Sequence, residues 1–135
     1  MNQGAPNIAP NAWPVLATAG PANGASKPAA GNPIRNLSAA PVAVKTSSGV
    51  LLALVIENNQ AATTFVQLFD AIAGNVVLGT THPDVEYFVA ANAMAFMPLP
   101  SVGWPFGVAL SIAATTTGGG NVGSAAGVNV YPVFA

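Results

Sequence analysis

The chain has 135 residues, of which 52% are hydrophobic and only 5% are charged, whereas an ordinary soluble domain carries about 25% charged residues. Three basic and four acidic residues form no basic stripe for phosphates or anionic lipids, so binding to nucleic acid or to a membrane surface is not expected. No cysteine is present, which excludes a disulfide framework and a thiolate metal site. A surface with so few charges is expected to face other protein rather than water.

The first 40 residues are rich in proline and glycine and have neither helical nor strand periodicity. They hold only two charged residues, whereas disordered tails are usually rich in charge. Their apolar side chains, including Ile8, Trp13 and Leu16, would gain from burial. We therefore predict an extended N-terminal arm over residues 1–40 that is anchored on neighbouring subunits by Trp13. The alternative is a disordered tail.

Residues 41–135 have the pattern of a single β domain, in which short apolar strands alternate with turn-forming residues. The expected strands are 42–46, 50–56, 63–70, 76–78, 85–89, 107–113 and 128–134, and the apolar segment 94–97 precedes a pair of prolines. Segment 50–56 is apolar on both faces, which predicts a central strand covered on both sides. Val108, Leu110 and Ile112 are expected to point inward. About seven or eight such strands predict an all-β fold, an antiparallel β-sandwich of the jelly-roll or Ig-like type.

Few residues could carry chemistry. His82 is the only histidine; with Asp84 or Asp70 and a serine it could form a triad, but no G-x-S-x-G elbow is present, and segment 79–84 is better explained as a turn. Asp84 could join a calcium site, although hard cations usually need several carboxylates. Gly118–Gly120 lacks the Lys and Ser/Thr of a phosphate-binding loop. We predict no catalytic, metal or cofactor site, and therefore no enzyme.

Two aromatic residues, Trp104 and Phe106, lie between prolines and glycines. Such a cluster could stack on sugar rings, or it could fill a core or an interface, where tryptophan is enriched. Polar partners for sugar hydroxyls are scarce nearby, which favours the core or the interface. The candidate interface residues are therefore Ile8, Trp13, Leu16, Trp104 and Phe106.

Several short segments together carry a resemblance to a known group of proteins. They are 44–51, 58–62, 65–70, 77–81 and 107–117. These segments are similar to a β-sandwich module that recurs in virion proteins of tailed bacteriophages, including capsid cement (decoration) proteins. The resemblance covers about Val44 to Ala135 and not the arm.

This resemblance implies a structural virion protein on the outer surface of the capsid, assembled in the host cytoplasm. Its partners would be the major capsid protein and further copies of itself, as a homotrimer that bridges capsid subunits. The group has no catalytic motif to carry over. One alternative is a tail or fibre-attachment protein. Another is a carbohydrate-binding module that uses Trp104 and Phe106.

Overall fold

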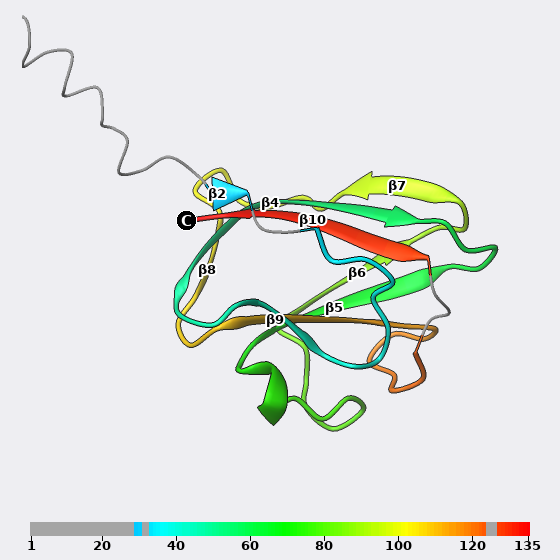
Figure 1. Cartoon of the computed structure of the whole chain (residues 1–135), viewed down its shortest axis with the longest axis horizontal. Helices are drawn as coiled ribbons and strands as arrows, with labels where there is room; N and C mark the ends of the chain where they lie inside the picture. Colours follow the sequence, from blue (N-terminus) through cyan, green and yellow to red (C-terminus); the bar gives the residue numbers. More distant parts are fainter. Residues whose placement is uncertain (1–28, 31–32, 124–126) are drawn as a thin grey trace, which may run out of the picture.

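Two antiparallel sheets pack face to face in the computed structural model, which describes residues 29–30, 33–123 and 127–135 (Figure 1). The first, the β10–β4 sheet, consists in order of β2 (Ala29–Ala30), β10 (Val128–Phe134), β4 (Gly49–Asn58) and β7 (Ala93–Phe96), with β8 (Trp104–Phe106) also paired to β4. The second, the β9–β5 sheet, consists of β3 (Val42–Lys45), β9 (Leu110–Thr115), β5 (Thr64–Asp70) and β6 (Val85–Val89). The prediction of an antiparallel β-sandwich is confirmed.

The strand pairing decides between the two predicted sandwich types. β2 pairs with β10, β3 with β9, β4 with β7 and β5 with β6, all antiparallel. β8 pairs with the first residues of β4, and β7 pairs with the last residues of β4. The two short strands therefore lie one after the other along the same edge of β4. Strands early in the chain thus pair with strands late in the chain in a nested order, and the pairs divide between two sheets. This is the topology of a jelly roll.

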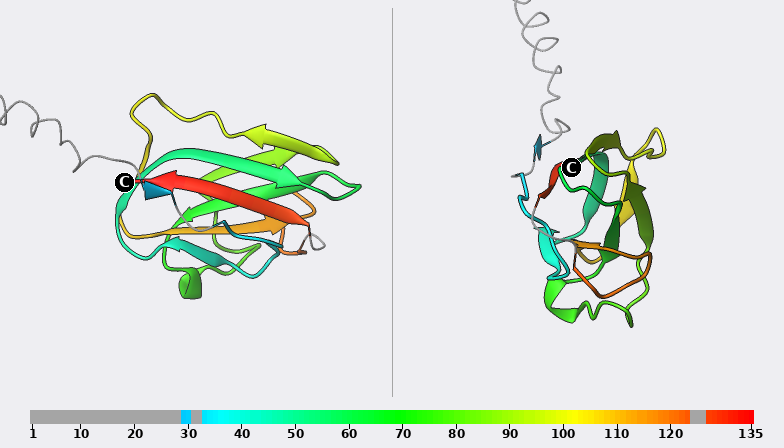
Figure 2. Two further views of the ribbon diagram at one scale, coloured as in Figure 1. Left: turned by 45° about the horizontal axis from the view of Figure 1, so that its top comes forward. Right: turned by 90° about the vertical axis from the view of Figure 1, so that its right-hand side faces the viewer.

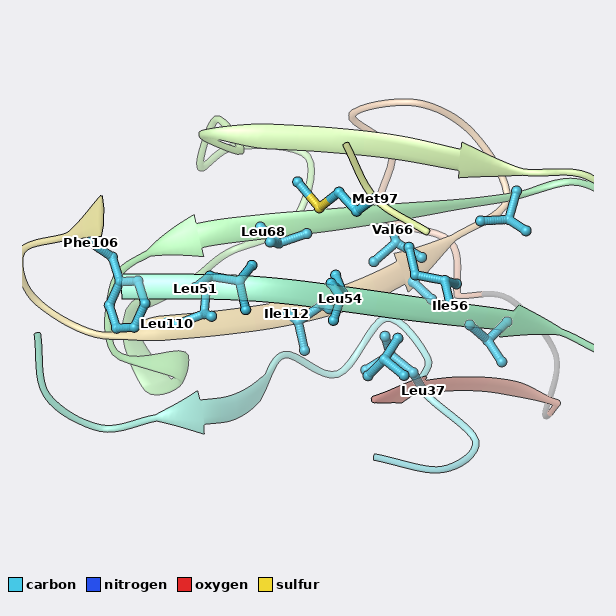
Figure 3. Packing of buried hydrophobic residues seen from close by; sticks show 14 residues of the cluster. Leu37, Leu51, Leu54, Ile56, Val66, Leu68, Met97, Phe106, Leu110 and Ile112 are labelled. Carbon is cyan, nitrogen blue, oxygen red and sulfur yellow. The ribbon is translucent and has the colours of Figure 1, made fainter. Parts of the chain in front are cut away.

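The core lies between the sheets and follows from the period of two along each strand, which sends alternate side chains inward. Leu54 and Ile56 of β4 meet Val66 and Leu68 of β5, and all four are at most 2% exposed (Figure 3). Full burial of each such side chain contributes about 1.5–3 kcal/mol. The predicted central position of segment 50–56 is confirmed, since β4 lies between β10 and the β7 and β8 edge.

The segment that follows β2 is part of the sandwich. Ile34 forms an isolated antiparallel bridge with Val130. Leu37 is 1% exposed in the core, and its N–H donates to the Val128 carbonyl at 2.8 Å. The chain therefore enters the fold by Ala29, within the region assigned to the arm. Residues 1–28, with Ile8, Trp13 and Leu16, lie outside the described residues.

The strand predicted at 76–78 is wrong. The short 3-10 helix η2 (Ala73–Asn75) ends immediately before this segment, which has no strand and leads into a turn that begins at Leu78. Val76 is 8% exposed and packs with Phe69 and Ala113. Figures 1 and 2 show this loop against the side of the β9–β5 sheet that faces away from the other sheet. The apolar residues of this loop cover the outer side of the β9–β5 sheet. A short apolar segment that covers a sheet has the same composition as a short buried strand, so the two cannot be distinguished in the sequence.

The region before β9 also differs from prediction. Val108 is 55% exposed instead of pointing inward, because β9 begins only at Leu110. The Asp70 carboxylate accepts N–H groups from Gly107 and Val108 and holds these residues in a turn. Leu110 and Ile112 are buried as predicted.

Candidate interface on the outer face of the β10–β4 sheet

One face of the β10–β4 sheet points away from the core and is mainly apolar. Residues directly opposite each other on antiparallel strands share a face. Since Leu54 and Ile56 point into the core, their neighbours on β4 point outward and define the face with their partners. We call this set the outer face; its members are Ala53, Val55, Glu57, Met94, Phe96, Asn129, Tyr131 and Val133.

Exposure on the outer face rises from the centre of the sheet to its edge. Val55 and Tyr131 are half-buried, whereas Met94 is 59% and Phe96 is 73% exposed. Segment 50–56 was predicted to be covered on both sides. On the outer face this covering is incomplete. Exposed apolar residues that share one face are characteristic of a protein contact, whereas scattered ones need no explanation.

The single charge on the outer face is held by its neighbours. The Glu57 carboxylate accepts a hydrogen bond from Asn129 Nδ2 at 2.6 Å and lies 3.4 Å from the Tyr131 hydroxyl. The Asn129 bond is the main reason why the pKa of Glu57 lies below its ordinary value. The carboxylate is therefore ionised near neutral pH and does not act as a general acid there. Its contacts fix Tyr131 on the face.

The backbone of β7 is open on the side away from β4. The Met97 N–H donates to the Leu54 carbonyl at 2.9 Å. Bonded and non-bonded pairs alternate along an antiparallel ladder, so Ala93 and Ala95 also turn their backbone groups toward β4. Met94 and Phe96 turn theirs toward the open edge. Within the described residues no further strand pairs with β7. The strand itself has none of the charges or prolines that usually protect an edge, and Pro98 ends the run of open backbone groups after Phe96.

The two aromatic residues of β8, Trp104 and Phe106, differ in burial. Phe106 is 3% exposed and belongs to the core, which is one of the two positions predicted for this cluster. Trp104 is half-buried and packs against the same core, with the two ring centroids 6.3 Å apart. The cause is the pairing of β8 with β4, which points both side chains inward. A sugar platform made of these two rings is therefore not available.

The acidic residues are engaged in separate structural contacts. Asp84 accepts the Asp70 N–H at 2.7 Å, and Glu86 accepts the Gly119 N–H at 2.6 Å. His82 is exposed on the loop before β6. Among the residues that the structure describes, no three His, Asp or Glu side chains gather where they could hold a metal ion.

Sequence reasoning missed the outer face as a site. Its signal is the alternation Ala93-Met94-Ala95-Phe96, with small and large apolar residues in turn, which places both large side chains on one face of a strand. Within the part of the chain that the structure describes, no helix has the length and hydropathy to cross a membrane. No protein-family model, curated protein or solved structure matches this chain.

Proposed function

We propose that this chain is a structural protein of a bacteriophage virion, a capsid cement protein that binds and stabilises the shell of the major capsid protein. It would sit on the outer surface of the capsid as a homotrimer. The observation that carries the proposal is the apolar outer face, which lies on a jelly-roll sandwich with only 5% charged residues. Jelly rolls occur in viral capsid proteins, although also in lectins and cupins.

The physical basis of the proposal is burial of apolar area at low desolvation cost. Apolar surface removed from water contributes about 25 cal/mol per Å², and a specific contact buries about 800 Å² on each partner. Charged groups on a contact must be paired or they oppose binding. The charged member of the outer face, Glu57, has hydrogen-bond partners in Asn129 and Tyr131, and its charge is also favoured by Arg35 nearby.

The test is binding of the purified protein to phage shells that lack it. Val133→Lys places a charge on the outer face, and we expect it to weaken shell binding at least tenfold. Val77→Lys is the matched control, because Val77 is 59% exposed on the loop that follows η2. Equal binding by both variants would contradict the proposal.

The tail or fibre-attachment alternative is tested by location. Immunogold labelling of intact virions on the head is the expected result, and labelling confined to the tail would favour that alternative. The carbohydrate-binding alternative is disfavoured because Phe106 is in the core. Binding on a glycan array that is lost on Trp104→Ala would revive it.

A further inference from the structure

We propose that the open edge of β7 accepts an added strand from the N-terminal segment of a neighbouring copy of this chain, contributed by residues 15–19. The inference deepens the proposed assembly role by naming the acceptor of the arm. It concerns contacts between copies, so it can be tested without a capsid.

The acceptor has the backbone and the side chains that strand addition needs. Met94 and Phe96 direct their backbone N–H and C=O groups outward, and their side chains lie on the outer face beside the edge. In strand addition, main-chain hydrogen bonds provide affinity and the flanking side chains provide contacts for alternate residues of the added strand. β7 offers both without a charged residue on the strand.

The size of the edge argues against direct pairing of two β7 strands. β7 has 4 residues, which is about 13 Å at ~3.3 Å per residue. A stable contact needs about 800 Å² on each partner, and two such short strands side by side bury far less. The occupant must therefore be a segment that also covers part of the outer face.

The N-terminal segment has such a stretch at a suitable distance. Residues 15–19, Val-Leu-Ala-Thr-Ala, are the longest run without proline or glycine among the first 28 residues. Proline is absent from strand interiors that must donate hydrogen bonds. Residues 20–28 connect this run to β2 and span up to about 30 Å when extended.

The position of β2 favours a neighbouring copy as the donor. β2 and β7 lie at opposite edges of the same sheet. Ala29 pairs with Phe134 at the end of β10, whereas β7 pairs with the far end of β4. A strand from the same chain would have to cross its own outer face. A strand passed to the next copy makes a head-to-tail contact, in which every copy donates at one edge and accepts at the other. Such contacts close into a ring when the rotation between copies closes, and otherwise they form an open filament.

Disulfide trapping tests the proposal, because the native chain has no cysteine. Differently tagged Leu16→Cys and Met94→Cys chains are co-expressed, oxidised, and analysed for a disulfide that joins the two tags. The control replaces Met94→Cys with Thr80→Cys, at an exposed position on the loop before β6. We expect at least a tenfold higher yield of the mixed disulfide with Met94→Cys. Equal yields would overturn the proposal.

The chain that donates the strand is identified with the double variant Leu16→Cys/Met94→Cys. At high dilution, a disulfide within a monomer would show that the segment returns to its own β7, which also overturns the proposal. Sedimentation provides a second measurement. Phe96→Lys should weaken self-association at least tenfold, while Phe88→Lys, 64% exposed on β6 of the other sheet, should not. If the disulfide and sedimentation tests fail but Val133→Lys still weakens shell binding, the strand exchange is overturned and the proposed function stands.

Discussion

The Asp70 carboxylate closes the turn that leads into β9. One oxygen accepts the Gly107 N–H and the other accepts the Val108 N–H, both at 2.7 Å, and Ala109 adds a longer bond at 3.2 Å. The Gly107 and Val108 bonds lower the pKa of Asp70 below its ordinary value of 3.8. Backbone N–H groups stabilise the ionised form, as at a helix N-terminus.

Asp70 therefore makes stability depend on acid pH. Its folded pKa is depressed, so its contribution is complete above the ordinary value and is lost as pH falls through the folded value. We expect Asp70→Asn to be less stable than the wild type by about 1 kcal/mol at pH 7, because the amide group has one acceptor oxygen and leaves the N–H of Gly107 or Val108 without its bond. The difference should shrink below pH of about 4. Denaturant unfolding between pH 2.5 and 7 measures it, and a difference that does not change with pH would contradict the assignment.

Gly103 occupies a position that no other residue fits. Its φ is +85°, and a Cβ there would lie 2.5 Å from Val50 Cγ1 and 2.8 Å from the Leu51 carbonyl oxygen. Left-handed backbone costs about 1–2 kcal/mol for an L-residue, and overpacking adds about 1–3 kcal/mol. We expect Gly103→Ala to lower the free energy of unfolding by about 2–5 kcal/mol. Gly74→Ala, which has open space around it, is the control and should stay within about 0.5 kcal/mol of wild type.

At the scale of elements, the segment that precedes β3 belongs to the fold, because Ile34 bridges Val130 and the Ser38 carbonyl accepts the Ala114 N–H. Leu37 is 1% exposed among core residues from both sheets. We expect Leu37→Ala to destabilise the fold by about 2–5 kcal/mol, as for other buried leucines. Deletion of residues 1–28 should leave the melting temperature nearly unchanged, whereas deletion of residues 1–40 should unfold the protein. A stable fold after the longer deletion, measured by circular dichroism, would show that this segment is dispensable.

Strands with clear apolar alternation and turn-forming neighbours could be predicted from the sequence. Segments 85–89 and 128–134 match β6 and β10 residue for residue. Val76 could not be placed, because a single covering loop and a short strand have the same local composition. β8 was not predicted because it has only 3 residues with Pro105 at its centre, so its pairing with β4 depends on tertiary context.

The sequence predicts that an interface exists, but it does not predict where the interface lies. Low charge indicates that some surface faces other protein, but composition does not say which one. Trp104 and Phe106 were predicted as interface candidates because they are large aromatic residues. Whether their side chains point into the core or outward depends on the register of β8 with β4. The alternation at 93–96 predicts that Met94 and Phe96 share one face of a strand, but only the sheet order and the burial show that this face is exposed beside an edge.

At the scale of the whole molecule, we expect self-association that depends on apolar contact rather than on charge. The formal net charge is −1, so there is little repulsion to overcome and little attraction for salt to screen. The dissociation constant should change less than threefold between 50 and 500 mM NaCl, and association should strengthen on warming from 5 to 25 °C. Sedimentation at micromolar concentration measures both. A stable monomer, or dissociation by salt, would contradict an apolar interface.

The nested strand pairing has a consequence for synthesis on the ribosome. Glu57 of β4 meets its partner Asn129 of β10 across 72 residues of sequence. At about 5–20 residues per second, the apolar run from Val50 to Ile56 leaves the ribosome roughly 4–14 s before the strand that will cover one of its edges. Uncharged apolar segments that wait unpaired are prone to aggregate. Expression at lower temperature or with added chaperones should therefore raise the yield of soluble chain without any change in the stability of the folded state.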